Sequence, residues 1–335
     1  MNKKHFTIPV FIPEEACPFQ CIFCNQKKIS GQMHLPSFDE IHRIIEKYLS
    51  TIPKENSEIE IGFFGGNFTG IPLDQQEKYL QIANEYLGNR ISAIRLSTRP
   101  DYINKDVINL LKSYNVKTVE LGAQSLDDEV LKESGRGHKA EDVINASMII
   151  KNAGLNLGLQ MMIGLPGDTL EKTIYTANKI VQLKADSTRI YPTLVINGTA
   201  LQKLFSAGKY KPLELDEAVN WTKIILPIFE NGNVDILRIG LHPSEGLLNG
   251  HELVAGPFHV SFKELVLTSI WHDLLSALEF EKDKMEITIT ANERELNYAS
   301  GYKASNRKML EKRFRKVRFA ADPTLTKREF NVLYS

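Results

Sequence analysis

Short apolar segments alternate with amphipathic segments along the first 240 residues, and this alternation constrains the fold more than any other feature of the sequence. The apolar segments, which we expect to be β-strands, are Phe6–Ile12, Ile59–Phe64, Ile91–Ser97, Val116–Leu121, Leu155–Ile163, Ser187–Val195 and Val234–Ile239. The segments with apolar residues at helical spacing include Phe38–Leu49, Gln75–Leu87, Lys105–Ser113 and Asp142–Ala153. Six or seven βα units of about 30 residues predict an α/β fold whose parallel sheet is partly closed, as a partial (β/α)6 TIM-like barrel. The pattern alone leaves an open doubly wound sheet as the alternative.

Three helix ends carry their own signals. Ser37 precedes the first expected helix and Glu40 stands three residues later, which predicts a capping box. Gly88 and Gly154 follow the ends of two other expected helices, where a glycine commonly ends a helix.

The pattern changes after about residue 240. We expect an ordered loop over Leu241–Phe262 and a helix over Glu264–Leu278, and then a strand, a helix and a strand over Glu286–Thr290, Ser305–Phe314 and Lys316–Phe319. The sequence therefore predicts a partial barrel over residues 1–240 and a small α+β C-terminal extension that covers the barrel over residues 241–335. Residues 303–328 hold ten Lys and Arg and two Asp and Glu. Such a basic tail is either a solvated face or a patch that faces RNA or another anion.

The charge balance and the absence of long apolar runs exclude two classes of protein. Lys+Arg and Asp+Glu both number 41, so the whole surface does not form an electrostatic trap for nucleic acid. No run of about 18 apolar residues exists, and the first residues lack the apolar stretch of a signal peptide. We therefore expect a cytoplasmic protein with no membrane partner.

The three cysteines of the chain are crowded together in a C-x3-C-x2-C run, as Cys17, Cys21 and Cys24, directly after the first expected strand. A secreted disulfide framework would have an even number of cysteines spread along the chain, so this run indicates metal ligands. Three thiolates around a cluster of four irons would leave one iron open for another ligand. A zinc site completed by His34 or His5 and three unrelated structural cysteines are the alternatives.

With Phe23 before the last cysteine, this run resembles the C-x3-C-x-aromatic-C signature of the radical S-adenosylmethionine (SAM) superfamily. The resemblance implies a 4Fe-4S cluster held by Cys17, Cys21 and Cys24, with SAM chelating the fourth iron. It also implies reduction by a flavodoxin- or ferredoxin-type partner and cleavage of SAM to a 5′-deoxyadenosyl radical, which abstracts hydrogen from a substrate. The fold of that superfamily is a partial (β/α)6 barrel, in agreement with the strand pattern.

Motifs at the strand ends extend the resemblance, most closely to the subgroup that includes the catalytic subunit of Elongator. They imply that SAM contacts Phe23, Gly65, Gly66, Asn67, Ser97, Arg99, Gln124, Arg136, Gln160, Gly164, Leu165 and Tyr191. In relatives the Gln reaches the ribose of SAM and the Arg reaches its carboxylate, roles that fall here to Gln124 and Arg136. Asn67 stands where relatives commonly have Glu, and Gln160 stands where they often have Asp.

Segments after the barrel, Arg238–Ser244 and Ala255–His259, are similar to the extension that follows the barrel in the Elongator-like subgroup. The chain stops well short of that subgroup's acetyltransferase domain, so the resemblance does not carry over Elongator's reaction. Among stand-alone members the chain is similar to the queuine lyases, which implies cleavage of a carbon–nitrogen bond in the free base queuine to release 7-aminomethyl-7-deazaguanine. A tRNA- or RNA-modifying radical SAM enzyme and a non-catalytic metal-binding module are the alternatives.

The queuine hypothesis assigns roles to side chains near the expected mouth of the barrel. A carboxylate would pair with the guanine-like edge of the base, since donors buried without partners are costly. His242, His259 and Glu245 are the candidate catalytic residues, because a proton donor for the departing amine could lie in their loop. The candidate substrate residues are Glu14, Phe68, Glu120, Arg189, Arg238 and Phe258.

Overall fold

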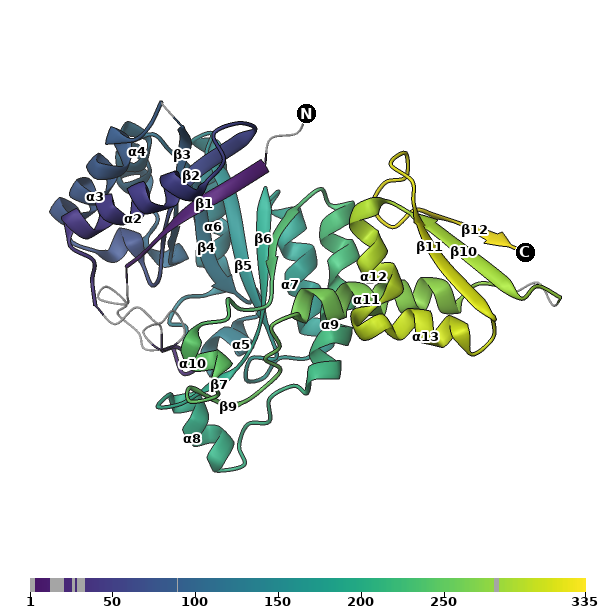
Figure 1. Ribbon diagram of the computed structural model, residues 1–335. Coiled ribbons are helices and arrows are strands. Elements are labelled where there is room, and N and C mark those ends of the chain that lie inside the picture. Colours follow the sequence, from purple (N-terminus) through teal and green to yellow (C-terminus); the bar gives the residue numbers. More distant parts are fainter. Residues whose placement is uncertain (1–3, 13–20, 26–27, 29–33, 89, 280–282) are drawn as a thin grey trace. The chain divides into compact units, whose positions relative to one another are not determined.

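The computed structural model describes the chain except for residues 1–3, 13–20, 26–27, 29–33, 89 and 280–282 (Figure 1). It divides into two compact units. The first unit comprises Met1–Glu214 and Ile225–Phe258, and the second comprises Leu215–Ile224 and His259–Ser335. No helix in the described part of the chain is both long enough and apolar enough to cross a membrane.

A seven-stranded, all-parallel sheet with the order β1-β2-β3-β4-β5-β6-β8 forms the core of the first unit (Figure 1). Its strands are β1 (Lys4–Phe11), β2 (Ser57–Phe64), β3 (Ile91–Thr98), β4 (Val116–Gln124), β5 (Asn156–Ile163), β6 (Ser187–Pro192) and β8 (Asp235–Ile239). Within this sheet, each strand lies beside the sheet strand that precedes it in the sequence. This single-direction order is that of a sheet curling into a partial TIM-like barrel, and it confirms the expected fold class and excludes the doubly wound sheet.

Helices connect successive strands and pack against the sheet (Figure 1). They are α2 (Phe38–Thr51), α3 (Leu73–Glu85), α4 (Lys105–Ser113), α5 (Asp128–Glu133), α6 (Ala140–Asn152), α7 (Leu170–Gln182), α8 (Ala200–Ser206) and α9 (Leu215–Asn231), with short 3-10 turns at Phe68–Gly70 and Pro100–Tyr102. The capping box at Ser37 and Glu40 is present. Gly88 and Gly154 both adopt a positive φ, as expected of glycines that follow helices.

The sixth expected strand and the loop that follows the barrel both differ from the sequence-based expectation. The run Ser187–Val195 is interrupted after Pro192, and Val195–Ile196 form a separate strand, β7. The expected loop over Leu241–Phe262 contains a short helix, α10 (Glu245–Leu248), and a strand, β9 (Leu253–Ala255), which pairs with β7. Because this pairing ties residues 241–258 to the first unit, the division between the units lies after the expected boundary at residue 240.

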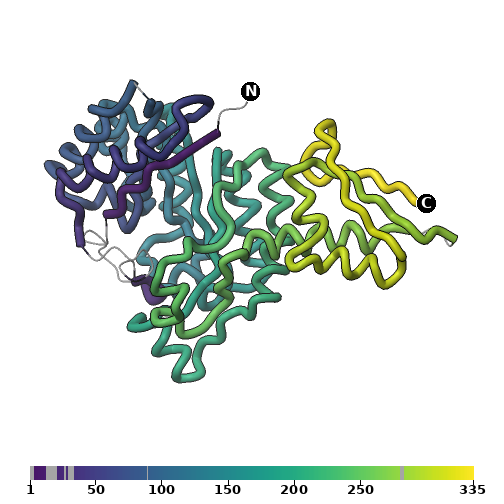
Figure 2. The backbone as a smooth tube through the Cα atoms, in the orientation of Figure 1, coloured from purple at the N-terminus to yellow at the C-terminus, as the bar shows by residue number. Residues whose placement is uncertain are grey.

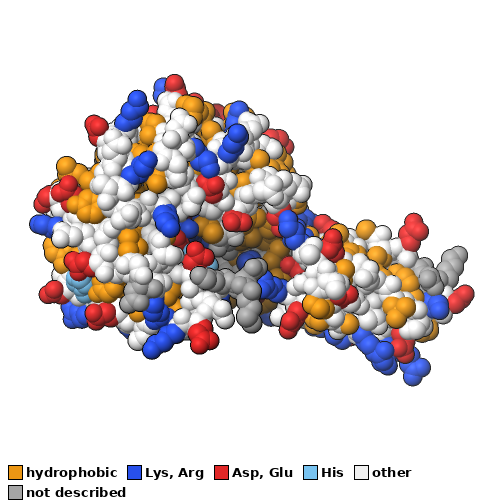
Figure 3. Space-filling view, turned by 90° about the horizontal axis from the view of Figure 1, so that it is seen from above, with side chains coloured by type: hydrophobic (Ala, Val, Ile, Leu, Met, Phe, Trp, Pro, Cys, Tyr) orange, Lys and Arg blue, Asp and Glu red, His pale blue; other side chains and the backbone are white. Residues whose placement is uncertain are grey.

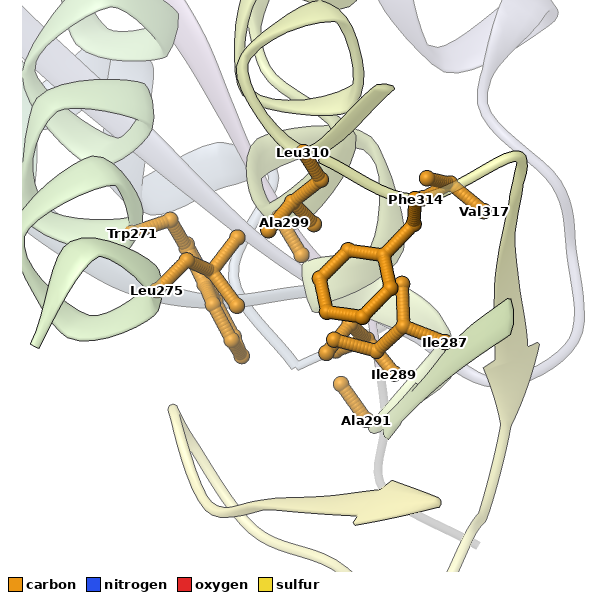
Figure 4. Close-up of a cluster of buried hydrophobic side chains, with 9 residues drawn as sticks. All are labelled: Trp271, Leu275, Ile287, Ile289, Ala291, Ala299, Leu310, Phe314 and Val317. Carbon is orange, nitrogen blue, oxygen red and sulfur yellow. The ribbon is translucent and has the colours of Figure 1, made fainter. Parts of the chain in front are cut away.

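The second unit packs helices on one face of a three-stranded sheet (Figure 2). Its elements are α11 (Phe262–Ser276), β10 (Glu286–Ala291), the 3-10 turn Glu293–Glu295, α12 (Leu296–Ser300), the 3-10 turn Tyr302–Ala304, α13 (Ser305–Glu311), β11 (Lys316–Ala321) and β12 (Phe330–Tyr334). β10 pairs in parallel with β11 and antiparallel with β12. The sequence did not predict α12 or β12. Trp271, Ile287, Ile289, Leu310 and Phe314 are buried together at the centre of this unit (Figure 4).

Candidate functional site

Two of the three cysteines, Cys21 and Cys24, lie in the described part of the chain, while Cys17 and Glu14 lie outside the described residues. Cys21 is buried and Cys24 is partly buried, and neither forms a disulfide. A tight turn brings the two together, since the N–H of Cys24 donates to the carbonyl of Cys21 over 3.0 Å. The Sγ of Cys21 accepts a hydrogen bond of 3.1 Å from Nη1 of Arg136. Cysteine sulfurs are the protein ligands of iron–sulfur clusters, and this one lies within hydrogen-bond distance of a guanidinium.

Arg136 joins the cysteine turn to the ends of the central strands. Its Nη2 donates to the carbonyl of Gly122 at the end of β4 over 2.5 Å. Its own carbonyl accepts a hydrogen bond of 2.7 Å from Nη2 of Arg99, at the end of β3. Arg99 in turn pairs with Asp101 through two bonds of 2.9 Å. The ends of β3 and β4 and the Cys21 turn therefore meet at one buried residue, Arg136.

Gln124 ends β4 in a strained conformation beside Arg136. A register shift follows Gly122, and Gln124 has a φ of 64°, which is uncommon for a residue with a side chain. Its Oε1 is buried and has no hydrogen-bond partner among the described residues, and the same is true of Nε of Arg136. An unpartnered acceptor and an unpartnered donor at one place fit the hydroxyl and carboxylate groups of SAM.

Two glycines follow β2 at the same edge of the sheet, so no side chain covers the backbone there. Gly65 and Gly66 have φ values of 93° and 97°, which glycine adopts without strain. Asn67, which replaces the more common Glu, has its Oδ1 engaged within the protein. It accepts hydrogen bonds from Oγ1 of Thr98 over 2.6 Å and from the N–H of Arg99 over 3.2 Å. The Asn67 side chain therefore fastens the end of β2 to the end of β3.

The loop after β5 also turns on a glycine. Gly164 has a φ of 73°, and its N–H donates to Oδ2 of Asp168 over 2.9 Å. The hydroxyl of Tyr210 donates to the carbonyl of Gly164 over 2.7 Å, so both backbone polar groups of Gly164 have partners. Burial raises the pKa of Asp168 to about 6, against the hydrogen bonds from Thr173 and Gly164, which lower it. Leu165 is buried beside Cys21 and Phe23 in one apolar cluster.

Inside the barrel, charged side chains of neighbouring strands form a continuous row that we call the charge ladder: Glu60, Arg95, Glu120 and Arg189. Nε of Arg95 lies 2.6 Å from Oε1 of Glu60, and its Nη1 lies 2.6 Å from Oε1 of Glu120. Arg189 holds the same Glu120 with bonds of 2.7 Å and 3.1 Å. Gln160, on the strand between them, donates to Oε2 of Glu120 over 3.0 Å and to Oγ of Ser97 over 3.2 Å.

The ladder keeps its carboxylates ionised despite burial. Burial opposes ionisation of Glu120, but the charge and hydrogen bonds of Arg189, followed by the charge of Arg95, outweigh it and lower the pKa. Burial likewise opposes ionisation of Glu60, and the hydrogen bond from His5 and the charge of Arg95 lower its pKa. A purine edge would therefore compete with several protein donors for Glu120.

At the β6 and β8 end of the ladder lies a second polar group, made of Tyr191, Arg238 and His242. Nε of Arg238 donates to the carbonyl of Gly240 over 3.1 Å, and its Nη2 lies 3.2 Å from Nδ1 of His242. No acidic partner of Arg238 occurs in the described part of the chain. Burial and the charge of Arg238 lower the pKa of His242, while burial, ahead of all neighbouring charges, raises that of Tyr191.

The remaining sequence-predicted residues are dispersed. Glu245 is exposed on α10. Phe68 is 3% exposed, and its ring packs against Phe63 and Tyr79, at centroid distances of 5.1 Å and 6.5 Å. Phe258 packs against the buried cluster around Leu247. His259 belongs to the second unit.

His34 and His5, either of which could complete the alternative zinc site, have other partners in the described structure. His34 is exposed and lies 3.4 Å from Glu40 at the start of α2. Nε2 of His5 lies 3.2 Å from Oε1 of Glu60, and this hydrogen bond raises the pKa of His5. Both histidines therefore have carboxylate partners.

Sequence reasoning missed Glu60, Arg95, Asp168 and His138. Glu60 and Arg95 lie in the middle of apolar strands, and a charged residue at an otherwise buried strand position is a signal that could have found them. His138 is buried behind Arg136, and burial together with the charges of Arg136 and Arg99 lowers its pKa to about 3. It is therefore a neutral imidazole close to Arg136 and Arg99.

Comparisons with known proteins agree with this arrangement. The family described as "Radical SAM superfamily" matches residues 11–180, and the "Radical_SAM C-terminal domain" matches residues 185–271. A tRNA uridine(34) acetyltransferase of Methanocaldococcus infernus is 31% identical over 206 residues, covering 53% of this chain and 38% of that protein. Elongator complex protein 3 of Dictyostelium discoideum is 26% identical over 214 residues, covering 58% of this chain and 38% of that protein.

Solved structures show the same fold. The archaeal Elp3 of Methanocaldococcus infernus, with an N-terminal deletion, superposes with a TM-score of 0.66 at 24% identity, covering 81% of this chain and 63% of that chain. The chain thus spans well under half the length of the curated relatives named above. What those relatives do as whole proteins is not carried over by the match.

Proposed function

The chain belongs to the radical SAM superfamily, and we propose that it is a lyase that cleaves the carbon–nitrogen bond of the free base queuine. The observation that carries the proposal is the charge ladder, a buried polar row whose Glu120 is joined through Gln160 to Ser97, two residues expected to contact SAM. A 4Fe-4S cluster and SAM, when bound, supply a radical able to abstract hydrogen from carbon. This chemistry requires a substrate held out of water, and a buried polar row offers such a place.

The residues present fit both cofactors. Cys21 and Cys24 lie on one turn and Arg136 donates to Cys21, which suits thiolate ligands of a cluster. The unpartnered atoms of Gln124 and Arg136 suit the polar groups of SAM. Cys17, by its place in the C-x3-C-x2-C run, would supply the third thiolate.

The positive and negative side chains of the charge ladder balance each other, which favours a polar, weakly charged substrate. Glu60 and Glu120 are matched by Arg95 and Arg189, so the ladder itself carries no unmatched charge. Arg238 lies beyond this matched set and offers hydrogen-bond donors. We assign to Arg238 the carbonyl oxygen of the base or the hydroxyls of its ring substituent, because guanidinium groups donate and cannot accept.

The lowered pKa of His242 favours a different role for this residue from the one expected from the sequence. Its pKa is lowered by burial and by Arg238, so its neutral form prevails near neutral pH. A neutral imidazole has one acceptor nitrogen, and Nδ1 of His242 already accepts from the guanidinium of Arg238, so Nε2 carries the hydrogen. We therefore assign to His242 a hydrogen bond that it donates to the substrate.

Modification of a base within RNA is the second candidate function. Two observations favour it: the relative at 31% identity is named a tRNA uridine(34) acetyltransferase, and the C-terminal tail is basic. The same radical chemistry would then act on a nucleotide that is part of a chain.

The test is an anaerobic assay of the reconstituted protein with dithionite, SAM and either queuine or queuosine-containing tRNA, read by mass spectrometry. We expect 5′-deoxyadenosine and 7-aminomethyl-7-deazaguanine from queuine, with a flavodoxin or ferredoxin able to replace dithionite. The Cys24→Ala variant is the matched control and should form neither product.

Each other result has a defined meaning. If 5′-deoxyadenosine forms but queuine is unchanged, the lyase proposal is wrong while the superfamily assignment stands. If product forms from the tRNA but not from queuine, the second candidate replaces the first.

A further inference from the structure

The second unit carries a concentration of positive charge that the proposed function does not use. Residues 303–318 hold eight Lys and Arg and one acidic residue, Glu311. They make up the end of the 3-10 turn, α13, the following turn and the start of β11. Lys and Arg side chains gather along one edge of this part of the molecule (Figure 3). Like charges repel, so such a group is stabilised by a partner of opposite charge.

Most of these side chains reach solvent without a carboxylate partner. Lys308, Lys312 and Arg315 are exposed, and no ion pair is recorded for them within the described residues. Lys316 and Arg318 share Glu286, at 3.7 Å and 3.9 Å. Exposed pairs at such distances contribute little to stability, so these two cations also remain available to a polyanion.

A rigid loop lies at the N-terminal end of this basic segment. Gly301, Tyr302, Lys303 and Ala304 connect α12 to α13. Gly301, Lys303 and Ala304 have φ values of 85°, 53° and 59°. A Cβ at Gly301 would lie 2.5 Å from Oγ of Ser305, so this position requires glycine.

Hydrogen bonds to the core of the second unit hold this loop in place. The N–H of Tyr302 donates to Oγ1 of Thr268 over 2.9 Å, and Nδ2 of the fully buried Asn306 donates to the Thr268 carbonyl over 3.1 Å. Strain in two residues that are not glycine persists only where the surroundings enforce it. The loop conformation is therefore set before any ligand arrives.

An aromatic pair stands beside the loop. The rings of Tyr302 and His259 meet edge to face at a centroid distance of 5.4 Å, and Nζ of Lys303 lies 5.4 Å from the centre of the Tyr302 ring. A partly exposed ring next to a lysine offers a nucleobase one stacking surface and offers its phosphate one cation.

The arrangement as a whole matches one known way of holding RNA. In KH domains a Gly-x-x-Gly loop between two helices clamps the backbone of a few nucleotides. Here Gly301 begins such a loop, and Ala304, in the fourth position, holds a left-handed conformation that favours glycine. Helices α12 and α13 connect the parallel strands β10 and β11, so the loop and the basic strand belong to one rigid βααβ unit.

We propose that the loop Gly301–Ala304, α13 and the start of β11 form a docking surface for single-stranded RNA. The RNA backbone lies along Lys303, Lys308, Lys312 and Arg315, and one base stacks on Tyr302. A single small anion would use one or two of these cations, whereas a chain of phosphates would engage all of them.

Fluorescence anisotropy with a labelled twelve-nucleotide oligouridine tests the proposal on the full chain, at several salt concentrations. The triple variant Lys308→Ser, Lys312→Ser, Arg315→Ser should bind about tenfold more weakly, and its salt slope should fall by about 2, since each lost phosphate contact removes about 0.7. Tyr302→Ala should weaken binding about tenfold through the lost stacking. The control, Lys105→Ser, Lys112→Ser, Lys117→Ser, removes three exposed lysines of the first unit and should leave affinity unchanged.

Three results would overturn the proposal. The first is no oligouridine binding by the wild type at low salt. The second is equal loss of affinity in the triple variant and in the control. The third is binding to vesicles containing phosphatidylserine that depends on Lys308, Lys312 and Arg315 while oligouridine binding does not. The assay needs neither cluster nor substrate, so its outcome is separate from that of the lyase proposal.

Discussion

Nη1 of Arg136 lies 3.1 Å from Sγ of Cys21, although 115 positions separate the two residues in the sequence. This contact ties the turn of Cys21 and Cys24 to the central strands, because the same guanidinium also holds the carbonyl of Gly122. It also places a cation where it would donate to a sulfur ligand of the cluster.

Arg136→Gln should therefore leave the cluster assembled but lower its reduction potential. A hydrogen bond from a charged donor stabilises the more negative, reduced cluster, and its loss should shift the potential by on the order of 50 mV. Potentiometric titration followed by electron paramagnetic resonance measures the shift, and iron analysis measures assembly. The exposed Lys132→Gln is the control. An unchanged potential would mean that Arg136 does not contact the cluster ligands.

Glu120→Gln should destabilise the protein by about 3–5 kcal/mol, because it leaves Arg95 and Arg189 buried without their shared counter-charge. Urea-induced unfolding measures the loss. Glu58→Gln, on the same sheet but exposed, should change the free energy of unfolding by about 0.5 kcal/mol or less. Similar effects of the two substitutions would show that the charge ladder does not stabilise the barrel.

Asp168 should give the unfolding free energy a measurable pH dependence. Its pKa is raised to about 6 in the folded state, so the folded protein binds this proton more tightly than the unfolded chain does. The resulting stabilisation is complete below about pH 4 and is lost as the pH rises through 6. The difference in unfolding free energy between wild type and Asp168→Asn should change by about 2 kcal/mol between pH 4 and pH 7.

Urea-induced unfolding of both proteins at each pH makes this measurement, with the exposed Asp235→Asn as the control. A difference between wild type and Asp168→Asn that is constant with pH would show that Asp168 titrates as an ordinary surface carboxyl.

Arg238→Gln should separate substrate binding from SAM cleavage. Arg238 contacts neither cysteine nor the Gln124 region in the described structure, and its partners are Gly240 and His242. We expect an intact cluster spectrum, continued slow release of 5′-deoxyadenosine and at least about tenfold less product from queuine, the cost of one or more lost hydrogen bonds to substrate. Arg43→Gln, on the exposed side of α2, is the control. Wild-type turnover by Arg238→Gln would exclude this arginine from the substrate site.

Sequence reasoning predicted the barrel well because its strands are buried on both faces and read as continuous apolar runs. It was wrong about the run Ser187–Val195, since Pro192 cannot donate to a neighbouring strand and the chain leaves the sheet after it. The pairing of β7 with β9 involves two or three residues on each side, which is too short to produce a periodic pattern. The small helix α12 was missed for the same reason.

The candidate site was less predictable than the fold. Motifs pointed to Arg136 and Gln124, but the contact of Arg136 with Cys21 joins distant segments and depends on the folded sheet. Glu120 was expected to meet the substrate, yet its oxygens are engaged by Arg95, Arg189 and Gln160. The sequence cannot distinguish a carboxylate that awaits a ligand from one that is already paired, because the partners come from other strands.

The charge ladder also has a consequence for how the sheet assembles. A two-residue slip of β3 along β4 would keep apolar side chains on their proper face, so burial alone discriminates weakly against it. The same slip would separate Arg95 from Glu120 and break the buried charge ladder at its middle, leaving Arg95 with Glu60 alone and Glu120 with Arg189 alone. The alternating charges on neighbouring strands therefore destabilise a barrel whose strands are misaligned, and they do so before any cofactor binds.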